Sequence, residues 1–191
     1  MTDRAVRSAL SVFSTSLGWV GLMGDGDRDR VFALTFGHST PVQVRLHLES
    51  IAGLRFDVPD ADWSPDLRER LQAYALGAVV DFSDVEVDIR GLTTFRKNVV
   101  QALREVGYGQ TVSYSELAAL AGSPKAARAV GTAMSSNRVP IIVPCHRVVA
   151  EGHKLGGFSA PSGLSMKQRL LELEGVTHIR FNLRKAEQSL H

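Results

Sequence analysis

The hydrophobic pattern at the start of the chain alternates between short β-rich runs and turn sequences. Runs of β-branched, aromatic and aliphatic residues predict strands at Ser11–Phe13, Trp19–Met23 and Val31–Phe36. The pair Leu17-Gly18 and the stretch from Gly24 to Asp27 separate these runs and favour tight turns. Successive strands joined by short turns predict a β-meander.

Two helices are predicted after the meander, each at a Ser or Thr followed by proline. Thr40-Pro41 and Ser64-Pro65 combine an N-cap residue with proline at the first helical position. Apolar residues at helical spacing then predict one buried stripe per helix: Val44, Leu48 and Ile51 in the first, and Leu67, Leu71, Tyr74 and Ala78 in the second. The alternating run Val85–Ile89 predicts one more strand.

Beyond Gly91 the pattern becomes mainly helical. A stripe of apolar residues follows Thr93-Thr94 and predicts a helix: Phe95, Val99, Leu103 and Val106. Ser113 and Glu116 have the spacing of a capping box, and Gly122 stands where a helix ends. Ser123-Pro124 then predicts the start of the next helix. Two short helices joined by a tight glycine turn predict a helix-turn-helix.

These elements together predict an α+β protein with two domains. Residues 1–90 form a small N-terminal α/β domain, a β-meander plus helices, with no chemical motif. Residues 91–191 form a mostly helical C-terminal domain that contains the helix-turn-helix.

The second helix of the helix-turn-helix carries mostly small side chains. Ala126, Ala127 and Gly131 leave its backbone almost bare, and Arg128 is the long cation among them. Small side chains let a helix approach another surface closely. Close packing on a neighbouring helix is one interpretation, and a fit into a narrow DNA groove is another that also accounts for Arg128.

Charge is distributed unevenly between the two predicted domains. Residues 1–90 hold 9 Lys and Arg against 14 Asp and Glu, whereas residues 91–191 hold 13 against 6. The basic half therefore favours a polyanionic partner, although solvated basic faces are also common. The chain shows no signal-peptide pattern and no apolar run of membrane-spanning length, so we expect a cytoplasmic protein without a membrane partner.

Cys145 is the single cysteine, which excludes an internal disulfide and a multi-cysteine zinc site. It follows the apolar run Ile141–Val143, which predicts a buried strand or extended segment that delivers Cys145 to a pocket. A thiol reacts as its thiolate and needs a base or positive charge nearby, which His146 and Arg147 offer. His146 would reach Cys145 through a bent backbone or a bridging water.

A further helix is predicted from Ser165 to Gln168 onward, because these two residues have capping-box spacing. Glu174 falls on its apolar stripe, three residues beyond Leu171. A buried carboxylate needs a partner, which makes His146 a candidate and suggests a Cys145–His146–Glu174 relay. A carboxylate that stays in solvent near the helix end is the alternative.

The core Pro144-Cys145-His146-Arg147-Val148 resembles the active-site motif of the O6-alkylguanine-DNA alkyltransferases, also called methylated-DNA–protein-cysteine S-methyltransferases. The resemblance runs from about Gly91 to Gly175. It includes, in order, Arg128-Ala129-Val130-Gly131, Asn137 and Gly156-Gly157-Phe158-Ser159, and more weakly Leu17-Gly18-Trp19 upstream.

This resemblance implies DNA repair by one irreversible transfer of an alkyl group, such as methyl, from O6-alkylguanine to Cys145 by a single-turnover suicide enzyme. A water would bridge Cys145 to His146, and Glu174 would orient that histidine. The damaged base would be flipped out through the minor groove, with Arg128 entering the stack. Tyr114 would contact the displaced phosphate and donate a hydrogen bond to guanine.

The resemblance also implies the remaining site residues. Asn137 would hold the turn between the DNA-reading helix and the active site, and the carbonyls of Val148 and Cys145 would read the exocyclic amine. Ser159 would approach the O6 side, and other residues would form the pocket and the DNA-facing helix: Met134, Pro140, Gly157 and Phe158, and Ala126, Ala127 and Gly131. The expected partner is double-stranded DNA containing O6-alkylguanine, bound by a monomer without cofactor or metal.

Some positions depart from the family pattern. The segment Ser159–Gly163 is longer than Ser-Gly-Gly, which makes Glu174 rather than Glu172 the matching acid. Gly107-Tyr108 replaces Ile-Pro-Tyr, and the first helix after Gly91 lacks a Trp.

Two functions other than repair would also use a cysteine or a helix-turn-helix. For a cysteine hydrolase, the sequence shows no oxyanion-donor motif, and a DNA-binding regulator would need polar base-reading side chains. A binding-only relative that recognises alkylated guanine without repairing it would lack the acceptor cysteine, whereas Cys145 is present.

Overall fold

A computed structural model describes residues 8–25, 30–52, 59–152 and 154–179 of the chain. Contacts divide the chain into two compact units, Met1–Asp88 and Ile89–His191. Within the described residues, no helix combines the length and the apolar character needed to cross a membrane.

The first unit is built on the predicted meander. Strands β1 (Ser8–Thr15), β2 (Gly18–Asp25) and β3 (Arg30–His38) pair antiparallel in chain order. The three predicted strands are therefore confirmed, each a few residues longer than its apolar run. The second half of the predicted turn from Gly24 to Asp27 lies outside the described residues.

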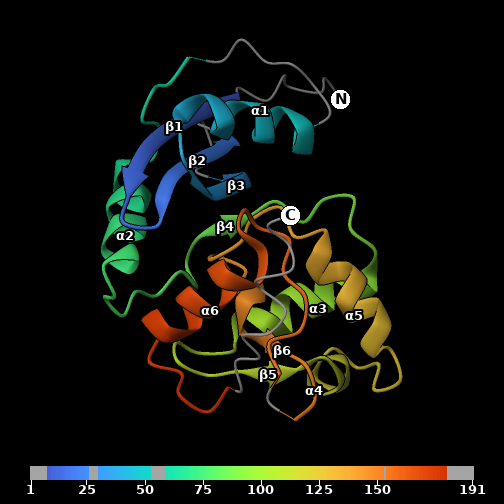
Figure 1. Cartoon of the computed structure of the whole chain (residues 1–191). Coiled ribbons are helices and arrows are strands. Elements are labelled where there is room, and N and C mark those ends of the chain that lie inside the picture. Colours follow the sequence, from blue (N-terminus) through green and yellow to red (C-terminus); the bar gives the residue numbers. More distant parts are fainter. Residues whose placement is uncertain (1–7, 26–29, 53–58, 153, 180–191) are drawn as a thin grey trace, which may run out of the picture. The chain divides into compact units, whose positions relative to one another are not determined.

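Helix α1 (Pro41–Ala52) packs on this sheet, as Figure 1 shows. Thr40 caps it by accepting a hydrogen bond from the Gln43 N–H at 3.3 Å. Gly21 of β2 makes the close approach possible, because a Cβ there would lie 2.3 Å from Val44 Cγ1. The core between helix and sheet contains Leu10, Met23, Ala33, Val44 and Leu48.

Helix α2 (Pro65–Ala75) begins at its predicted proline, and Leu67, Leu71 and Tyr74 are buried. The prediction that Ala78 belongs to this stripe is wrong. The helix ends at Ala75, and Gly77 then adopts a positive φ of 92°. The strand predicted over Val85–Ile89 is reduced to β4 (Glu86–Val87), which pairs parallel with β3.

The second unit contains four α-helices within the described residues: α3 (Thr94–Arg104), α4 (Tyr114–Leu120), α5 (Ala127–Ser135) and α6 (Gly163–Leu173). Strands β5 (Val112–Ser113) and β6 (Val148–Val149) form a short parallel pair. The predicted capping box at the start of α4 is confirmed, since Ser113 and Glu116 exchange both hydrogen bonds. Gly122, with a φ of 76°, follows the C-terminus of α4 and begins the turn that leads to α5.

Two predicted helix starts in this unit are wrong. Helix α5 begins at Ala127 rather than after Ser123, because Ser123-Pro124 forms a turn closed by the Ala126 N–H and the Ser123 carbonyl at 2.9 Å. Helix α6 begins at Gly163, and Ser165 donates to the Ser162 carbonyl instead of capping the helix.

The extended segment predicted at Ile141–Val143 is also wrong in conformation, although all three residues are buried. The segment forms a turn in which the Val143 N–H bonds to the Val139 carbonyl at 2.9 Å and Ile141 has φ 72°. A short apolar run signals burial but does not distinguish a strand from a buried turn.

Candidate active site

Cys145 opens the 3-10 helix η1 (Cys145–Arg147), directly after the buried turn. Asn137 spans that turn. Its Oδ1 accepts from the Val139 N–H at 3.1 Å, and its Nδ2 donates to the Val143 carbonyl at 2.8 Å. Asn137 therefore connects the end of α5 to the segment that carries Cys145.

Cys145 is buried, with 7% of its surface exposed. Burial raises the pKa of the Cys145 thiol, because the thiolate loses hydration. The hydrogen bond from Asn137 and the charge of Lys167 act in the opposite direction. The resting group is therefore a thiol, which requires a base before it can react.

His146 and Glu174 lie together in the structure. His146 Nε2 is 2.8 Å from Glu174 Oε1, and both side chains are buried. Burial lowers the pKa of His146 more than the neighbouring carboxylate raises it, so the imidazole is neutral at pH 7. A neutral imidazole that donates from Nε2 carries its lone pair at Nδ1.

Glu174 is also bound by Arg147. Arg147 Nε donates to Oε2 and Nη2 to Oε1, each at 2.9 Å, while Nη1 donates to the Val106 carbonyl at 2.5 Å. Burial alone would raise the pKa of Glu174. The hydrogen bond from His146 and the paired guanidinium outweigh burial and hold that pKa well below its usual range.

The loop after α3 completes the support for Glu174. The Gly109 N–H donates to Glu174 Oε2 at 3.2 Å, and Tyr108 Oη donates to the Leu173 carbonyl at 2.9 Å. Gly109 has φ 72°, and a Cβ there would lie 2.9 Å from the Glu174 carbonyl oxygen. This position therefore requires glycine.

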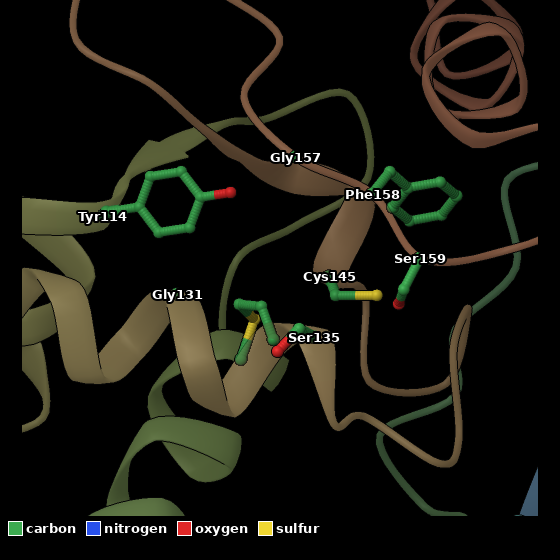
Figure 2. A pocket seen from close by; sticks show the side chains of 8 residues that line it. Tyr114, Gly131, Ser135, Cys145, Gly157, Phe158 and Ser159 are labelled. Carbon is green, nitrogen blue, oxygen red and sulfur yellow. The ribbon is translucent and has the colours of Figure 1, made fainter. Parts of the chain in front are cut away.

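A pocket opens beside Cys145 with a volume of about 180 Å³. Its lining comes from the start of α4, from α5, from η1 and from the segment after β6: Tyr114, Gly131, Met134, Ser135, Cys145, Gly157, Phe158 and Ser159. Figure 2 shows the Cys145 sulfur directed toward Ser159 and the Tyr114 hydroxyl pointing into the space above α5. Seven of these residues were predicted from the sequence, and Ser135 was missed although it lies one helical turn beyond Gly131.

Other predicted site residues lie outside this lining. Val148 is fully buried, with its carbonyl accepting from Lys167, and Pro140 is partly buried in the turn after α5. Arg128 is exposed on α5, one residue after Ala127, and Ala126 is the N-cap. An exposed arginine on a helix that also lines the cysteine pocket is suited to contact a ligand approaching that pocket.

Lys167 is the buried residue that the sequence analysis missed. It has no exposed surface, and its Nζ donates to the Val148 carbonyl at 2.5 Å and to the Gly157 carbonyl at 3.2 Å. Burial lowers its pKa to about 8, while Cys145 acts in the opposite direction. Its spacing contained a signal, because Lys167 stands seven residues before Glu174 on the same apolar stripe.

No group of three or more His, Cys, Asp or Glu side chains in the described part of the chain could hold a metal ion. The side chains gathered around Cys145 are a buried thiol, a neutral imidazole fixed by a carboxylate, a phenol and a buried ammonium. This set defines a nucleophilic cysteine site whose pocket shares a wall with a helix-turn-helix.

Comparison with known proteins identifies the family to which this site belongs. Residues 94–176 match the model of the DNA-binding domain of 6-O-methylguanine DNA methyltransferases. A methylated-DNA–protein-cysteine methyltransferase of Methanosarcina acetivorans is 43% identical over 126 residues, which cover 63% of this chain and 78% of the relative. One of Mycobacterium tuberculosis is 46% identical over 118 residues, 59% of this chain and 69% of the relative.

Solved structures show the same similarity. The crystal structure of Mycobacterium tuberculosis OGT in complex with DNA has a TM-score of 0.70 and 33% identity, covering 87% of this chain and 93% of that one. The O6-methylguanine-DNA methyltransferase of Pyrococcus kodakaraensis has a TM-score of 0.69 and 29% identity, covering 88% and 99%. The chain belongs to the methylated-DNA–protein-cysteine methyltransferase family.

Glu174→Gln should destabilise the protein at pH 7 by about 3–5 kcal/mol, because it leaves Arg147 buried without its counter-charge. The folded-state pKa of Glu174 lies below its unfolded value of about 4.3, so its contribution is present above that pH and is lost as pH falls through the acid range. The stability difference between wild type and variant should therefore shrink below about pH 5. Urea unfolding across a pH series measures this difference.

Glu172→Gln is the matched control, since Glu172 is exposed on the same helix and its carboxylate accepts a hydrogen bond from Gln168 at 2.8 Å. It should change stability by less than about 0.5 kcal/mol. Equal stability of the Glu174 variant and wild type at pH 7 would contradict the buried-pair account.

Proposed function

We propose that this protein repairs DNA by moving the alkyl group of O6-alkylguanine onto Cys145 in one irreversible step. One observation carries the proposal: Cys145 lines a pocket whose other wall is α5, the second helix of the helix-turn-helix. A nucleophile and a DNA-binding helix thereby share one cavity. Membership of the methyltransferase family and the similarity to a relative crystallised with DNA support it.

Activation of the thiol is assigned to His146. The neutral imidazole donates from Nε2 to Glu174 and offers its Nδ1 lone pair as the base, with a water as the proposed bridge to Cys145. The Glu174 carboxylate remains ionised beside Arg147 and stabilises the imidazolium that forms. Cys145 is then the alkyl acceptor, His146 is the base, and Glu174 is the carboxylate that orients His146.

Transfer forms a bond between the Cys145 sulfur and the alkyl carbon and breaks the bond between that carbon and O6. The electron pair stays on the guanine anion, to which the Tyr114 phenol donates a hydrogen bond and which water then protonates. Burial raises the pKa of Tyr114, so the phenol is protonated and able to donate. A saturated carbon is attacked, so no oxyanion hole is needed, and the resulting thioether ends the activity of that molecule.

Access to the alkyl group requires the damaged base to leave the duplex. We assign to Arg128, exposed on α5, the role of filling the space that the base leaves. The small residues Ala126, Ala127 and Gly131 would let α5 approach the minor groove. Ser159, Phe158, Met134 and Pro140 would surround the flipped base, and the carbonyls of Cys145 and Val148 would read its exocyclic amine.

The proposal includes a division of labour between the units. The first unit serves as structural support, and the second binds DNA and accepts the alkyl group. We expect the protein to act as a monomer, in the cytoplasm, on double-stranded DNA and without a cofactor.

The carbonyls of Cys145 and Val148, which are assigned to reading the base, already accept a hydrogen bond within the protein, from the Val148 N–H and from Lys167. Each carbonyl oxygen retains a second lone pair for the base.

Incubation with duplex DNA containing O6-methylguanine should add one methyl group to the wild-type protein, located on the peptide that contains Cys145. Cys145→Ser should add none while retaining duplex binding, because the substitution removes the acceptor and leaves α5 unchanged. Intact mass and a binding titration measure the two properties. Repeated turnover by one protein molecule, or methyl addition to the Cys145→Ser variant, would contradict the proposal.

Arg128→Ala should slow reaction with the duplex by about tenfold or more, because filling the vacancy offsets part of a few kcal/mol of unstacking. It should retain most of its rate toward free O6-benzylguanine, which needs no flipping. Lys125→Ala is the control, since it removes an exposed cation just before α5. Equal loss with both substrates would indicate a structural role for Arg128, and loss with neither would refute its assignment.

A further inference from the structure

Lys167 is a buried cation for which the mechanism above has no role. Its ammonium lies between two backbone carbonyls on different segments: Val148 directly follows η1, and Gly157 belongs to the segment that lines the pocket. These acceptors are neutral. A buried ammonium normally has a carboxylate partner or loses its proton, because removal from water is unfavourable.

The charges around Cys145 suggest what this ammonium balances. Arg147 and Glu174 neutralise each other through paired hydrogen bonds, and His146 is neutral. With Lys167 protonated and Cys145 a thiol, this buried group of residues carries one net positive charge. Ionisation of the thiol brings the net charge to zero. The interaction is mutual, since Lys167 lowers the pKa of Cys145 and Cys145 raises that of Lys167.

We propose that Lys167 is a positioning residue for alkyl transfer: the Val148 and Gly157 carbonyls hold its ammonium where it serves as the counter-ion of the Cys145 thiolate. This inference rests on the function proposed above. It assigns the stabilisation of the thiolate to a residue that lies outside the Pro144–Val148 motif in the sequence but contacts it in the structure. His146 takes up the proton, and Lys167 favours the charge that remains on sulfur.

The two groups should titrate as a coupled pair. Loss of one proton from the pair yields either thiolate with ammonium or thiol with amine, and the ratio between these two forms does not depend on pH. The thiolate population should therefore rise with pH and level off near pH 8, once the pair has lost its first proton. A second rise should follow at higher pH, when the remaining proton leaves.

The test measures the rate at which Cys145 reacts with iodoacetamide between pH 6 and pH 10, followed by intact mass. The thiolate displaces iodide, so the sulfur–carbon bond forms as the carbon–iodine bond breaks. We expect the wild-type rate to level off near pH 8. A wild-type rate that rises through pH 8 without a break would overturn the proposal, whatever the variants do.

Lys167→Met keeps most of the side-chain length and removes the charge. Its rate at pH 7 should fall roughly tenfold or more, and it should rise through pH 8 without levelling off, because the thiol then titrates alone at higher pH. Lys167→Arg keeps a permanent cation and should retain more of the rate at pH 7 than Lys167→Met. Lys154→Met, which removes an exposed lysine, should leave the profile unchanged.

A lower rate in Lys167→Met with the break near pH 8 retained would show a purely structural effect and overturn the proposal. If thermal unfolding shows that Lys167→Met does not fold, the proposal is tested by the break near pH 8 in the wild-type profile and by the rate of Lys167→Arg at pH 7. Iodoacetamide needs no DNA, so this result is independent of the repair assay. A wild type that shows the break but takes no methyl group from O6-methylguanine duplex would refute the proposed function and leave the Lys167 assignment intact.

Discussion

Glu174 is a buried carboxylate at the end of α6 that binds two other segments of the second unit. It accepts hydrogen bonds from His146 and Arg147 of η1 and from the Gly109 N–H, while the adjacent Leu173 carbonyl accepts from Tyr108. Removing such a charge from water is unfavourable unless it is fully hydrogen-bonded. Other arrangements that leave this carboxylate without its hydrogen bonds are therefore unfavourable. The hydrogen bonds to Glu174 fix the position of η1 and of Cys145 relative to α6.

The same constraint determines the chemistry of the site. Because Arg147 keeps Glu174 ionised, His146 donates from Nε2 and its lone pair remains at Nδ1. A histidine held by a carboxylate also serves cysteine hydrolases, but those act on carbonyl groups and need oxyanion donors. Here the neighbouring wall of the pocket is α5, with Gly131 and Met134, which favours DNA as the source of the substrate.

The sequence predicted most of the elements and much of the site, and its errors have physical causes. The three strand runs of the meander and the proline-marked starts at Pro41 and Pro65 were right, because local pattern and tertiary structure agree there. Ser123-Pro124 has the same signature but closes a turn, since proline also suits the second position of a turn. Glu174 was found because a carboxylate on an apolar stripe needs a partner. Lys167 satisfies the same criterion, yet its acceptors are backbone carbonyls, which no sequence pattern reveals.

The protonation state of His146 tests this account most directly. Nitrogen-15 NMR of the imidazole, with the wild-type protein at pH 7, distinguishes the two neutral tautomers and the imidazolium. The account predicts a neutral ring with its proton on Nε2, and the Nδ1 resonance of an unprotonated nitrogen. An imidazolium at pH 7, or a neutral ring with its proton on Nδ1, would contradict the role of Glu174 in preparing the base for Cys145.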